Sequence, residues 1–278
     1  MIQFGCQLLG RRRYLVLFLL LNICLLLPGC GTMSNGRRWG EDATLTPGWS
    51  KLGKSAADSI TSPVLYLPAA AALLLQIDGA DRRISDWARD HTPVYGSNRR
   101  AEDWSNDIRS YTSYTMYLTM LATPSGDEPI PWGVSKVKGV AVQQVAVSAS
   151  HFLISNLKDV TGRERPNNAD DRSFPAGKTP SAMAFSTISS RNIGTLNIPQ
   201  AAKTTLNIGL GTVMAAEAWS QVEAGSHYPA DTLAGISIAY FITSFINDSF
   251  MGIDAPGSGM PVAGFDGKEV YVGYCWRF

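Results

Sequence analysis

The sequence predicts an all-α protein, a helical bundle that ends in a short β-strand. Apolar segments rich in Ala, Leu and Val recur along the chain, each long enough for a helix and separated from the next by Gly, Pro and charged residues. Strict alternation of apolar residues occurs only near the C-terminus. With 278 residues and 45% hydrophobic residues, the chain is long enough to bury one sizeable core. The net charge of +1 gives no argument for nucleic-acid binding.

The chain begins with the features of a bacterial export signal. Three arginines, 11–13, precede an apolar run over 14–27, as in a secretory signal peptide. Leu27-Pro28-Gly29-Cys30 resembles the box at which bacterial lipoproteins are cleaved and acylated, although Pro28 replaces the usual small residue. A plain signal peptide with an incidental cysteine is the alternative. We expect residues 1–29 to be a lipoprotein signal peptide and Cys30 to carry the lipid that attaches the protein to a membrane.

The residue after the cysteine bears on location within the cell envelope. Gly31 is not the acidic residue that typically retains lipoproteins at the inner membrane, so the resemblance favours the outer membrane, facing the periplasm. Beyond residue 30 the chain has a single cysteine, Cys275, so a disulfide framework within one chain is excluded. Residues 30–60 are rich in Gly, Ser, Thr and charge, which predicts a flexible tether.

Residues 61–252 are predicted to form the helical domain. Helices are expected over 62–77, ended by Asp78-Gly79, over the charged segment 81–89, over 101–122, over 138–158 after a Pro/Gly-containing loop at 124–132, over 204–219 and over 232–246. Small residues dominate several of these helices, which allows close packing. No apolar run in this domain reaches the ~18 uninterrupted residues of a membrane span, which favours a water-soluble bundle.

Residues 253–278 are predicted to be a loop and a strand. Apolar side chains alternate from Val270 to Phe278, the period of a β-strand. Such a strand resembles the closing strand of outer-membrane barrels, but one strand cannot close a barrel. We therefore expect a ribbon folded onto the bundle.

Three short clusters of functional residues lie between Lys158 and Asp231. The first, 158–166, holds two cations seven residues apart and then a proline. The second, 173–181, is a Gly-containing turn that opens a helix. The third, 220–231, ends in a histidine with a carboxylate four residues on. Cations, backbone amides and a carboxylate-backed imidazole are the parts that phosphate transfer requires.

The three clusters resemble the motifs of the type 2 phosphatidic acid phosphatase / vanadium haloperoxidase family, which are Lys-x6-Arg-Pro, Pro-Ser-Gly-His and Ser-Arg-x5-His-x3-Asp. The residues that match the first and third motifs are Lys158, Arg165, Pro166, Ser220, His227 and Asp231. The resemblance covers roughly residues 60–250. It implies a helical bundle of that family's type and a phosphohistidine intermediate. The substrate would be a phosphate ester or lipid phosphate, with no cofactor.

The resemblance gives each matched residue a role. His227 would attack phosphorus, while Asp231 would fix the tautomer of its ring and support the positive charge that develops. Lys158 and Arg165 would bind the non-bridging phosphate oxygens. Two less specific interpretations remain open, in which His227 and Asp231 are a structural cap pair and the two cations belong to a solvated face.

The second cluster supplies backbone donors. Gly177 lies in the turn before a helix for which Thr179 is the predicted N-cap and Pro180 the first residue. Backbone N–H groups at such a helix start bind phosphate oxygens, so Gly177 joins the predicted phosphate-binding residues.

The sequence departs from the family at three positions. Ala176 and Lys178 replace Ser and His of the second motif, and Gln221 replaces Arg of the third. In the family that His donates a proton to the leaving group. Lys178 takes this catalytic position, but an ordinary lysine pKa of ~10.4 makes a poor proton donor near neutrality. Lys178 could still supply the positive charge that Gln221, in a phosphate-binding position, no longer brings.

Two further residues have open roles. His151 lies two turns before Lys158 on the same predicted helix, so one hypothesis is that it carries the missing proton; the alternative is a buried helix residue with satisfied hydrogen bonds. Arg163 is either a second phosphate contact or an ion-pair partner of Asp170 or Asp171.

Two functions from different classes follow. The first is a phosphoric monoester hydrolase, similar to phosphatidic acid phosphatases and acid phosphatases, with altered or reduced turnover. The second is a non-catalytic outer-membrane lipoprotein that binds phosphate or headgroups. A haloperoxidase is disfavoured because that chemistry depends on the same cations that are depleted here. The histidines and cysteines are too dispersed to predict a metal site, and the oligomeric state is left open.

Overall fold

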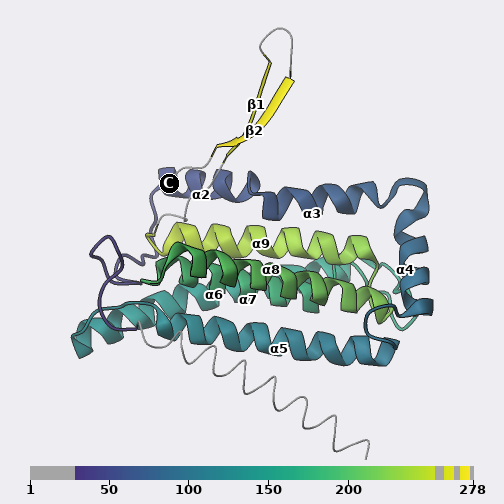
Figure 1. Cartoon of the computed structure of the whole chain (residues 1–278), viewed down its shortest axis with the longest axis horizontal. Coiled ribbons are helices and arrows are strands. Elements are labelled where there is room, and N and C mark those ends of the chain that lie inside the picture. Colours follow the sequence, from purple (N-terminus) through teal and green to yellow (C-terminus); the bar gives the residue numbers. More distant parts are fainter. Residues whose placement is uncertain (1–28, 254–259, 266–269, 276–278) are drawn as a thin grey trace, which may run out of the picture.

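A computed structural model describes residues 29–253, 260–265 and 270–275 (Figure 1). The predicted signal segment up to residue 28 lies outside the described residues. The elements in chain order are α2 (Trp49–Ile60), α3 (Pro63–Leu74), the 3-10 turn η1 (Ile77–Gly79), α4 (Ala80–His91), α5 (Asn98–Ala122), α6 (Pro129–Thr161), α7 (Lys178–Thr195), α8 (Gln200–Glu223), α9 (Pro229–Phe250), β1 (Met260–Phe265) and β2 (Val270–Cys275). The predicted helical bundle is confirmed.

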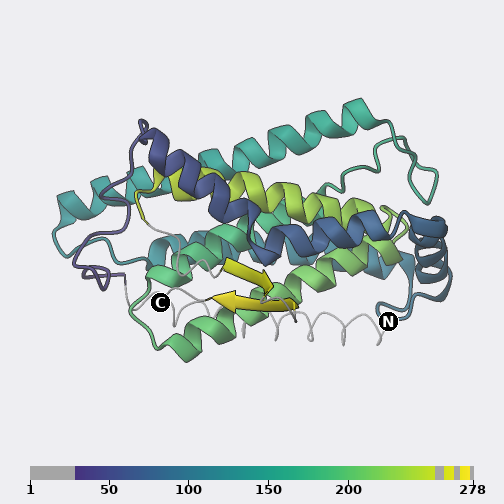
Figure 2. The same cartoon turned by 90° about the horizontal axis from the view of Figure 1, so that it is seen from above.

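Helices α7 and α9 form the centre of the bundle. Helix α7 packs on α5, α6 and α8, while α9 packs on α2, α3 and α6 as well as on α7. The two central helices approach closely where Gly235 of α9 faces Pro180 of α7, since a Cβ at Gly235 would lie 2.7 Å from Cγ of Pro180. Helices α6 and α8 lie on opposite sides of this pair (Figure 2).

Helix α4 crosses one end of the bundle, at the right of Figure 1, where α6 ends and α7 and α9 begin. The turns at this end follow from local sequence. Gly162, with φ of 55°, ends α6 in a left-handed conformation, and Pro229 occupies the first turn of α9, where its missing N–H is not needed. These ends point the three functional clusters toward one another.

Several boundaries differ from the sequence prediction. Helix α6 begins at Pro129 rather than residue 138, because prolines are tolerated in a first turn, whose N–H groups have no helical partner. Helix α7 begins at Lys178 with Gly177 as its N-cap, so the prediction of Thr179 as N-cap was wrong. Pro180 then lies in the third position, still within the first turn.

The predicted tether is also different in the structure. Residues 49–60 form α2, which packs on α9, and Trp39 is only 1% exposed. The Trp39 ring lies against Gly139 of α6, where an added Cβ would come within 2.4 Å of the ring. This segment is therefore folded onto the bundle, because it buries an aromatic residue that the Gly- and Ser-rich composition concealed.

The C-terminal strand is present as half of a hairpin. Strand β2 pairs with β1 in antiparallel register, from Met260 opposite Cys275 to Phe265 opposite Val270. Strand β1 was not predicted, because Pro261 and Gly264 interrupt its apolar pattern. Figure 1 shows the hairpin standing away from the helices rather than folded onto them.

Candidate active site

Residues from the first and third predicted clusters meet at the end of the bundle that α4 crosses. The last turn of α6 carries Lys158, the loop over residues 162–177 carries Arg165, and the loop between α8 and α9 carries His227. The start of α7 lies in the same place. Segments more than sixty residues apart in sequence therefore share one site.

The surroundings of His227 define the state of its ring. Only 2% of the residue is exposed. Its Nδ1 lies 2.6 Å from the main-chain oxygen of Ser173, and its Nε2 lies 3.3 Å from Nη1 of Arg165. A carbonyl can only accept a hydrogen bond and a guanidinium can only donate one, so Nδ1 carries the hydrogen and Nε2 keeps its lone pair. An unprotonated Nε2 is the nucleophilic nitrogen of an imidazole.

The charge on His227 follows from the same environment. Burial lowers the pKa of His227 well below 6.5, and the nearby positive charges of Lys158, Arg165 and Lys178 lower it further, against the opposing effect of the bond to Ser173. The ring is therefore neutral at pH 7.

Lys158 places an ammonium group at the start of α7. Its Nζ donates to the main-chain oxygen of Arg172 at 2.9 Å, and a Cβ added to Gly177 would lie 3.3 Å from Cε of Lys158. Burial lowers the pKa of Lys158 to about 8, helped by Arg165, so the group is mostly charged at neutral pH. The N–H groups of Lys178 and Thr179 at the start of α7 and this cation together favour an anion.

Arg165 is held over the imidazole by two neighbours. Its Nε donates to Oδ1 of Asp170 at 2.5 Å, and its Nη1 donates to the main-chain oxygen of Ser226 at 3.1 Å. Asp170 offsets part of the positive charge. Arg165 therefore contacts His227, and Lys158 lies near enough for its charge to lower the pKa of that ring. Asp170 is an addition that the sequence did not predict.

The position of Asp231 corrects its expected role. Among the hydrogen bonds of the described residues, none joins Asp231 to His227. The carboxylate instead accepts from Oγ of Ser173 at 2.5 Å, from the Tyr228 amide at 3.0 Å and from Arg163 at 2.5 Å. Asp231 is the third residue of α9, so its side chain turns back to cap the helix start. It therefore reaches the imidazole indirectly, through Ser173.

Arg163 belongs to this supporting group. Its guanidinium bridges Asp231 and Asp81 of α4, and it lies 4.2 Å from the centre of the Tyr228 ring. Of the two alternatives left open by the sequence, an ion pair with Asp170 or Asp171 is replaced by pairs with Asp81 and Asp231. The bridge ties α4 to the start of α9 and fixes the loop that carries His227.

Lys178 and Gln221 lie at the site but are engaged elsewhere. Nζ of Lys178 bonds to Glu102 of α5, which compensates its charge. The side-chain amide of Gln221 donates to Oγ of Ser105 at 2.6 Å, while its main-chain oxygen accepts from the His227 amide at 3.3 Å. Lys178 therefore does not replace the positive charge missing at Gln221. The expected phosphate contact from Gln221 is corrected to a backbone contact that positions His227.

Two carboxylates at the site were missed in the sequence. Glu102 accepts from Lys178 and, at 3.2 Å, from Oγ of Ser226. Glu217 is completely buried, accepts from Ser105 at 2.9 Å, and has no partner for Oε2 among the described residues. Burial raises the pKa of Glu217 to about 7. The sequence feature that could have revealed Glu217 is its position as a lone acid in the Ala-rich run of α8. Glu102 lies in a helix that carries no motif, so no feature of the sequence marked it.

His151 lies apart from the candidate active site. Its ring packs edge-on against Phe185, with 5.8 Å between ring centres. Phe185 lies two turns beyond Lys178 on α7, which is about 10 Å further into the bundle. The contacts thus oppose the hypothesis that His151 supplies the missing proton. Its Nε2 is buried without a hydrogen-bond partner in the described chain, so the alternative of a satisfied side chain is also corrected.

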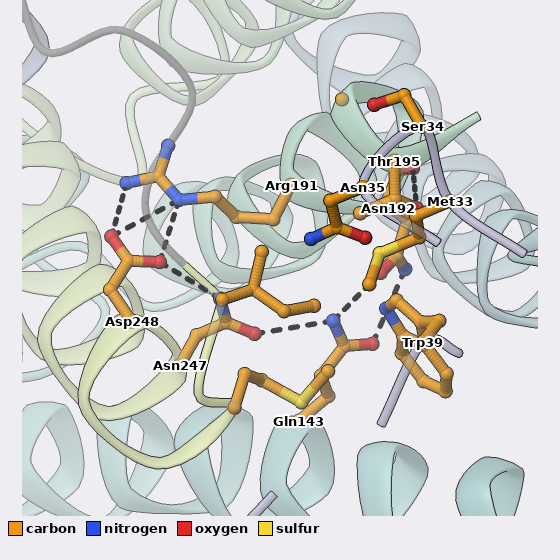
Figure 3. Close-up of a pocket in the computed structure, with 13 residues that line it drawn as sticks. Met33, Ser34, Asn35, Trp39, Gln143, Arg191, Asn192, Thr195, Asn247 and Asp248 are labelled. Atoms are coloured by element: carbon orange, nitrogen blue, oxygen red, sulfur yellow. Dashed lines mark hydrogen bonds and ion pairs between the residues drawn. The ribbon is translucent and has the colours of Figure 1, made fainter. Parts of the chain in front are cut away.

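Two cavities lie apart from His227. One, of ≈190 Å³, is at the opposite end of the bundle, where Gln143 lies between Asn192 and Asn247 and Arg191 pairs with Asp248 (Figure 3). The other, of ≈660 Å³, lies between α3 and α9, is lined mainly by Ala, Leu and Ile, and reaches Arg163. Neither is lined by His227, Lys158 or Arg165. In the described part of the chain, no group of three or more His, Cys, Asp or Glu residues could hold a metal ion.

The fold and the site together define an all-α protein with a neutral imidazole buried beneath cations. No family model matches the chain, and no curated protein matches it. A solved structure similar to it is a transmembrane PAP2-type phosphatidylglycerolphosphate phosphatase from Bacillus subtilis, with 18% identity, a TM-score of 0.48, and coverage of 66% of this chain and 90% of that one. At that level the likeness assigns neither an activity nor residue roles to this chain.

Proposed function

We propose that this protein hydrolyses phosphoric monoesters through a phosphohistidine at Nε2 of His227. The observation that carries the proposal is the state of the imidazole, which is neutral, protonated on Nδ1 and turned with Nε2 toward Arg165. A nucleophile, two cations and a helix start then lie within one site. These are the requirements of phosphoryl transfer, where positioning and charge stabilisation supply most of the rate.

In the first step Nε2 of His227 forms a bond to phosphorus as the ester P–O bond breaks. Lys158, Arg165 and the amides at the start of α7 stabilise the charge on the non-bridging oxygens. The bond between Arg165 and Nε2 must open for this attack, so the guanidinium exchanges the ring nitrogen for a phosphate oxygen. The Ser173 carbonyl meanwhile stabilises the cationic ring through Nδ1–H.

The leaving oxygen needs a proton, for which we propose the ammonium group of Lys178. In the second step water attacks the phosphohistidine, returns a proton to Lys178, and releases inorganic phosphate and neutral His227. Glu102 holds Lys178 in place through their ion pair. Because a lysine donates a proton less readily than a histidine near pH 7, turnover is expected to be slow.

We propose phosphomonoesters or lipid phosphates as the substrates. The predicted lipid on Cys30 would hold the protein at a membrane of the bacterial cell envelope, with the outer membrane facing the periplasm as the proposed location. A lipid-attached enzyme reaches both headgroups on a membrane surface and soluble esters. Cys30 is exposed, as an acylated residue would have to be.

Hydrolysis of p-nitrophenyl phosphate and phosphatidate by the purified full chain tests the proposal. The His227→Ala variant should lose both activities, while His91→Ala should retain them, since His91 is an exposed side chain stacked on Trp87. Brief reaction with ³²P-labelled substrate should label the wild type with acid-labile, base-stable phosphate. Activity that survives His227→Ala would contradict the proposed nucleophile.

One observation favours the second candidate, a phosphate-binding protein without turnover. The charge of Lys178 is compensated by Glu102, and the amide of Gln221 faces Ser105. Calorimetric titration with phosphate or vanadate, beside the hydrolysis assay, separates the two functions. Micromolar binding that His227→Ala weakens, with no hydrolysis of either ester, would identify the binding protein.

A further inference from the structure

The outer surface of the bundle is unusual for a protein surrounded by water. By length and composition, α9 is the one helix in the described residues that could cross a membrane, and 61% of its apolar stretch is buried in the bundle. Helices α2 and α3, bent by 49° at their junction, would be a second span if they are taken together. The hydropathy of one or two helices is weak evidence that a protein crosses a membrane. The arrangement of charge over all the helices is more informative.

Six helices each have a central segment without Asp, Glu, Lys or Arg. These segments are 62–77 at α3, 110–122 in α5, 139–157 in α6, 179–190 in α7, 204–216 in α8 and 232–247 in α9. At 1.5 Å per residue they are about 18 to 28 Å long. Helices that follow one another in the chain from α5 to α9 run in alternate directions, yet their uncharged segments coincide.

The charges that bound the segments lie at two common levels. At the active-site end they are Asp78, Arg109, Lys158, Lys178, Glu217 and Asp231. At the opposite end they are Asp58, Asp127, Lys138, Arg191, Lys203 and Asp248. The interactions agree with this grouping, since the charges of Lys158 and Lys178 both lower the pKa of His227 and Arg191 pairs with Asp248. The bundle therefore has an uncharged belt between two charged ends.

Large apolar side chains are exposed along this belt, beside uncharged polar ones such as Asn156 and Asn207. On α6, Val145 and Phe152 are 59% and 72% exposed. The other large apolar side chains exposed on the belt are Val64, Leu67, Leu73 and Leu74 of α3, Ile77 just after α3, Tyr114, Tyr117 and Leu121 of α5, Leu153 of α6, and Ile208 and Val213 of α8. Together they surround the bundle on several sides, which exceeds the scattered apolar residues of an ordinary surface.

The interior of the belt is correspondingly polar. Gln143 donates to Asn192 at 2.7 Å and to Asn247 at 3.2 Å, and Asn192 donates to Thr119 at 3.3 Å. All four residues are buried. Polar and small residues between helices, with apolar residues outside, are typical of helices that pack within lipid.

Tryptophans mark the two ends of the belt. Of the tryptophans in the described residues, Trp39, Trp49 and Trp132 lie at the far end, where Lys136 contacts the rings of Trp39 and Trp132. Trp87, Trp104 and Trp219 lie at the active-site end, where Trp87 contacts Trp219. Enrichment of tryptophan at the two borders of an apolar zone is the pattern of a membrane–water interface.

We infer that the uncharged belt lies in the hydrocarbon of a lipid bilayer, with the His227 end of the bundle at one membrane surface. The occupant of the exposed apolar faces is therefore lipid acyl chains. The uncharged segments of α3, α6 and α9 are about 24 to 28 Å long, while those of α5, α7 and α8 are about 18 to 20 Å long. The belt is therefore shorter than the ~30 Å of a typical hydrocarbon core, and thinner bilayers such as the bacterial outer membrane fit it better. This inference replaces the expectation of a water-soluble bundle, and it stands whether or not the site hydrolyses phosphate.

Photo-crosslinking from the acyl chains tests the inference. The full chain is reconstituted in vesicles of phosphatidylethanolamine and phosphatidylglycerol that contain a phosphatidylcholine with a diazirine at the acyl terminus. Mass spectrometry should find adducts on the exposed belt residues of α3, α6 and α8. Adducts confined to residues 1–30, or a detergent-free protein that stays soluble as a monomer or dimer, would overturn the inference.

A charge scan of α6 gives a second test. Val145→Glu and Phe152→Glu introduce charge on the belt. The matched controls Val137→Glu and Val160→Glu lie on the same helix beyond its two borders, where these side chains are 70% and 83% exposed. A carboxylate in hydrocarbon opposes insertion, so we expect the amount of membrane-integrated protein to fall about tenfold or more for Val145→Glu and Phe152→Glu. Equal amounts for all four variants would contradict a lipid-facing belt.

Discussion

At the scale of single residues, the site depends on keeping one imidazole neutral among cations. Burial and positive neighbours both lower the pKa of His227, so its nucleophilic form persists well below pH 6.5. Lys158 sets a limit at high pH, because burial lowers its pKa to about 8 and the ammonium group loses its charge above that pH. In the proposed reaction, these two groups would set the acid and alkaline sides of the active pH range.

The first prediction concerns this pH range. A plot of kcat/KM against pH should keep its value down through pH 6.5 and decline on the alkaline side near pH 8, as Lys158 loses its proton. Lys158→Arg should move the alkaline decline upward by a unit or more, because arginine stays charged. An alkaline limb unchanged in Lys158→Arg would exclude Lys158 as its source.

The second prediction separates Asp231 from His227. Asp231→Asn weakens the contact to Arg163 but leaves the Ser173 carbonyl on Nδ1 of His227. We expect a loss of stability on the order of 2 kcal/mol, from a weakened buried ion pair. We expect kcat/KM to fall less than about tenfold in the folded protein, because the imidazole keeps its tautomer. Thermal unfolding and assays well below the midpoint measure the two effects. A loss of activity as complete as that of His227→Ala would show that Asp231 acts directly.

The third prediction concerns the buried acid Glu217. Its pKa in the folded protein, about 7, is above the ordinary value of 4.5, so its contribution to stability is present below pH 4.5 and is lost as pH rises through 7. Glu217→Gln, which is neutral at every pH, should therefore be more stable relative to the wild type at pH 8 than at pH 5, by on the order of 3 kcal/mol at most. Midpoints of thermal unfolding at the two pH values measure this. An equal difference at both would mean that Glu217 does not titrate in this range.

At the scale of elements, close approaches at glycine hold the segments in place. Gly139 of α6 is in contact with the Trp39 ring, which lets residues 31–44 fold onto the bundle. The fourth prediction is that Gly139→Ala displaces this segment, since its Cβ would lie 2.4 Å from the ring. Trp39 should become exposed, with faster proteolysis of residues 31–48. Gly133→Ala, on the same helix with no atom within 4 Å, is the matched control. Equal proteolysis of the two variants would contradict a tight contact.

The elements also show how far the sequence could predict this molecule. Lys158, Arg165 and His227 were predicted together because their motif spacing places them on fixed turns of helices that converge. The contact between Lys178 and Glu102 joins residues 76 apart, and that between Arg163 and Asp81 joins residues 82 apart, so no local pattern encodes either. The partner of Nδ1 was equally hidden, because it is a main-chain carbonyl, which every residue possesses. Trp39 was missed because composition favoured a tether around it.

At the scale of the whole molecule, the bundle has two charged ends separated by the uncharged belt, and the two ends are not alike. The active site and α4 occupy one end (Figure 1), and the cavity with Arg191 and Asp248 occupies the other (Figure 3). With the belt in a bilayer, as we infer, a phosphate that reaches His227 would approach from one side of the membrane. This arrangement matches a site that acts on phosphates near a membrane surface, whether they belong to lipids or to soluble esters.

The last prediction uses the tryptophans as native depth probes. With the belt in lipid, the six tryptophans of the described residues lie near the two headgroup regions and none lies at the centre of the bilayer. Quenching by a lipid with a nitroxide near the headgroup should therefore exceed quenching by one with the nitroxide at the acyl terminus. Trp276 lies outside the described residues, so the measurement uses Trp276→Phe to remove its signal. A Tyr117→Trp variant, near the middle of the uncharged segment 110–122 of α5 and 45% exposed, provides the internal control, because its added fluorescence should respond more to the deeper quencher. If neither quencher affected the native tryptophans in vesicles, the belt would face water or protein, and the arrangement of charge along the helices would need another physical cause.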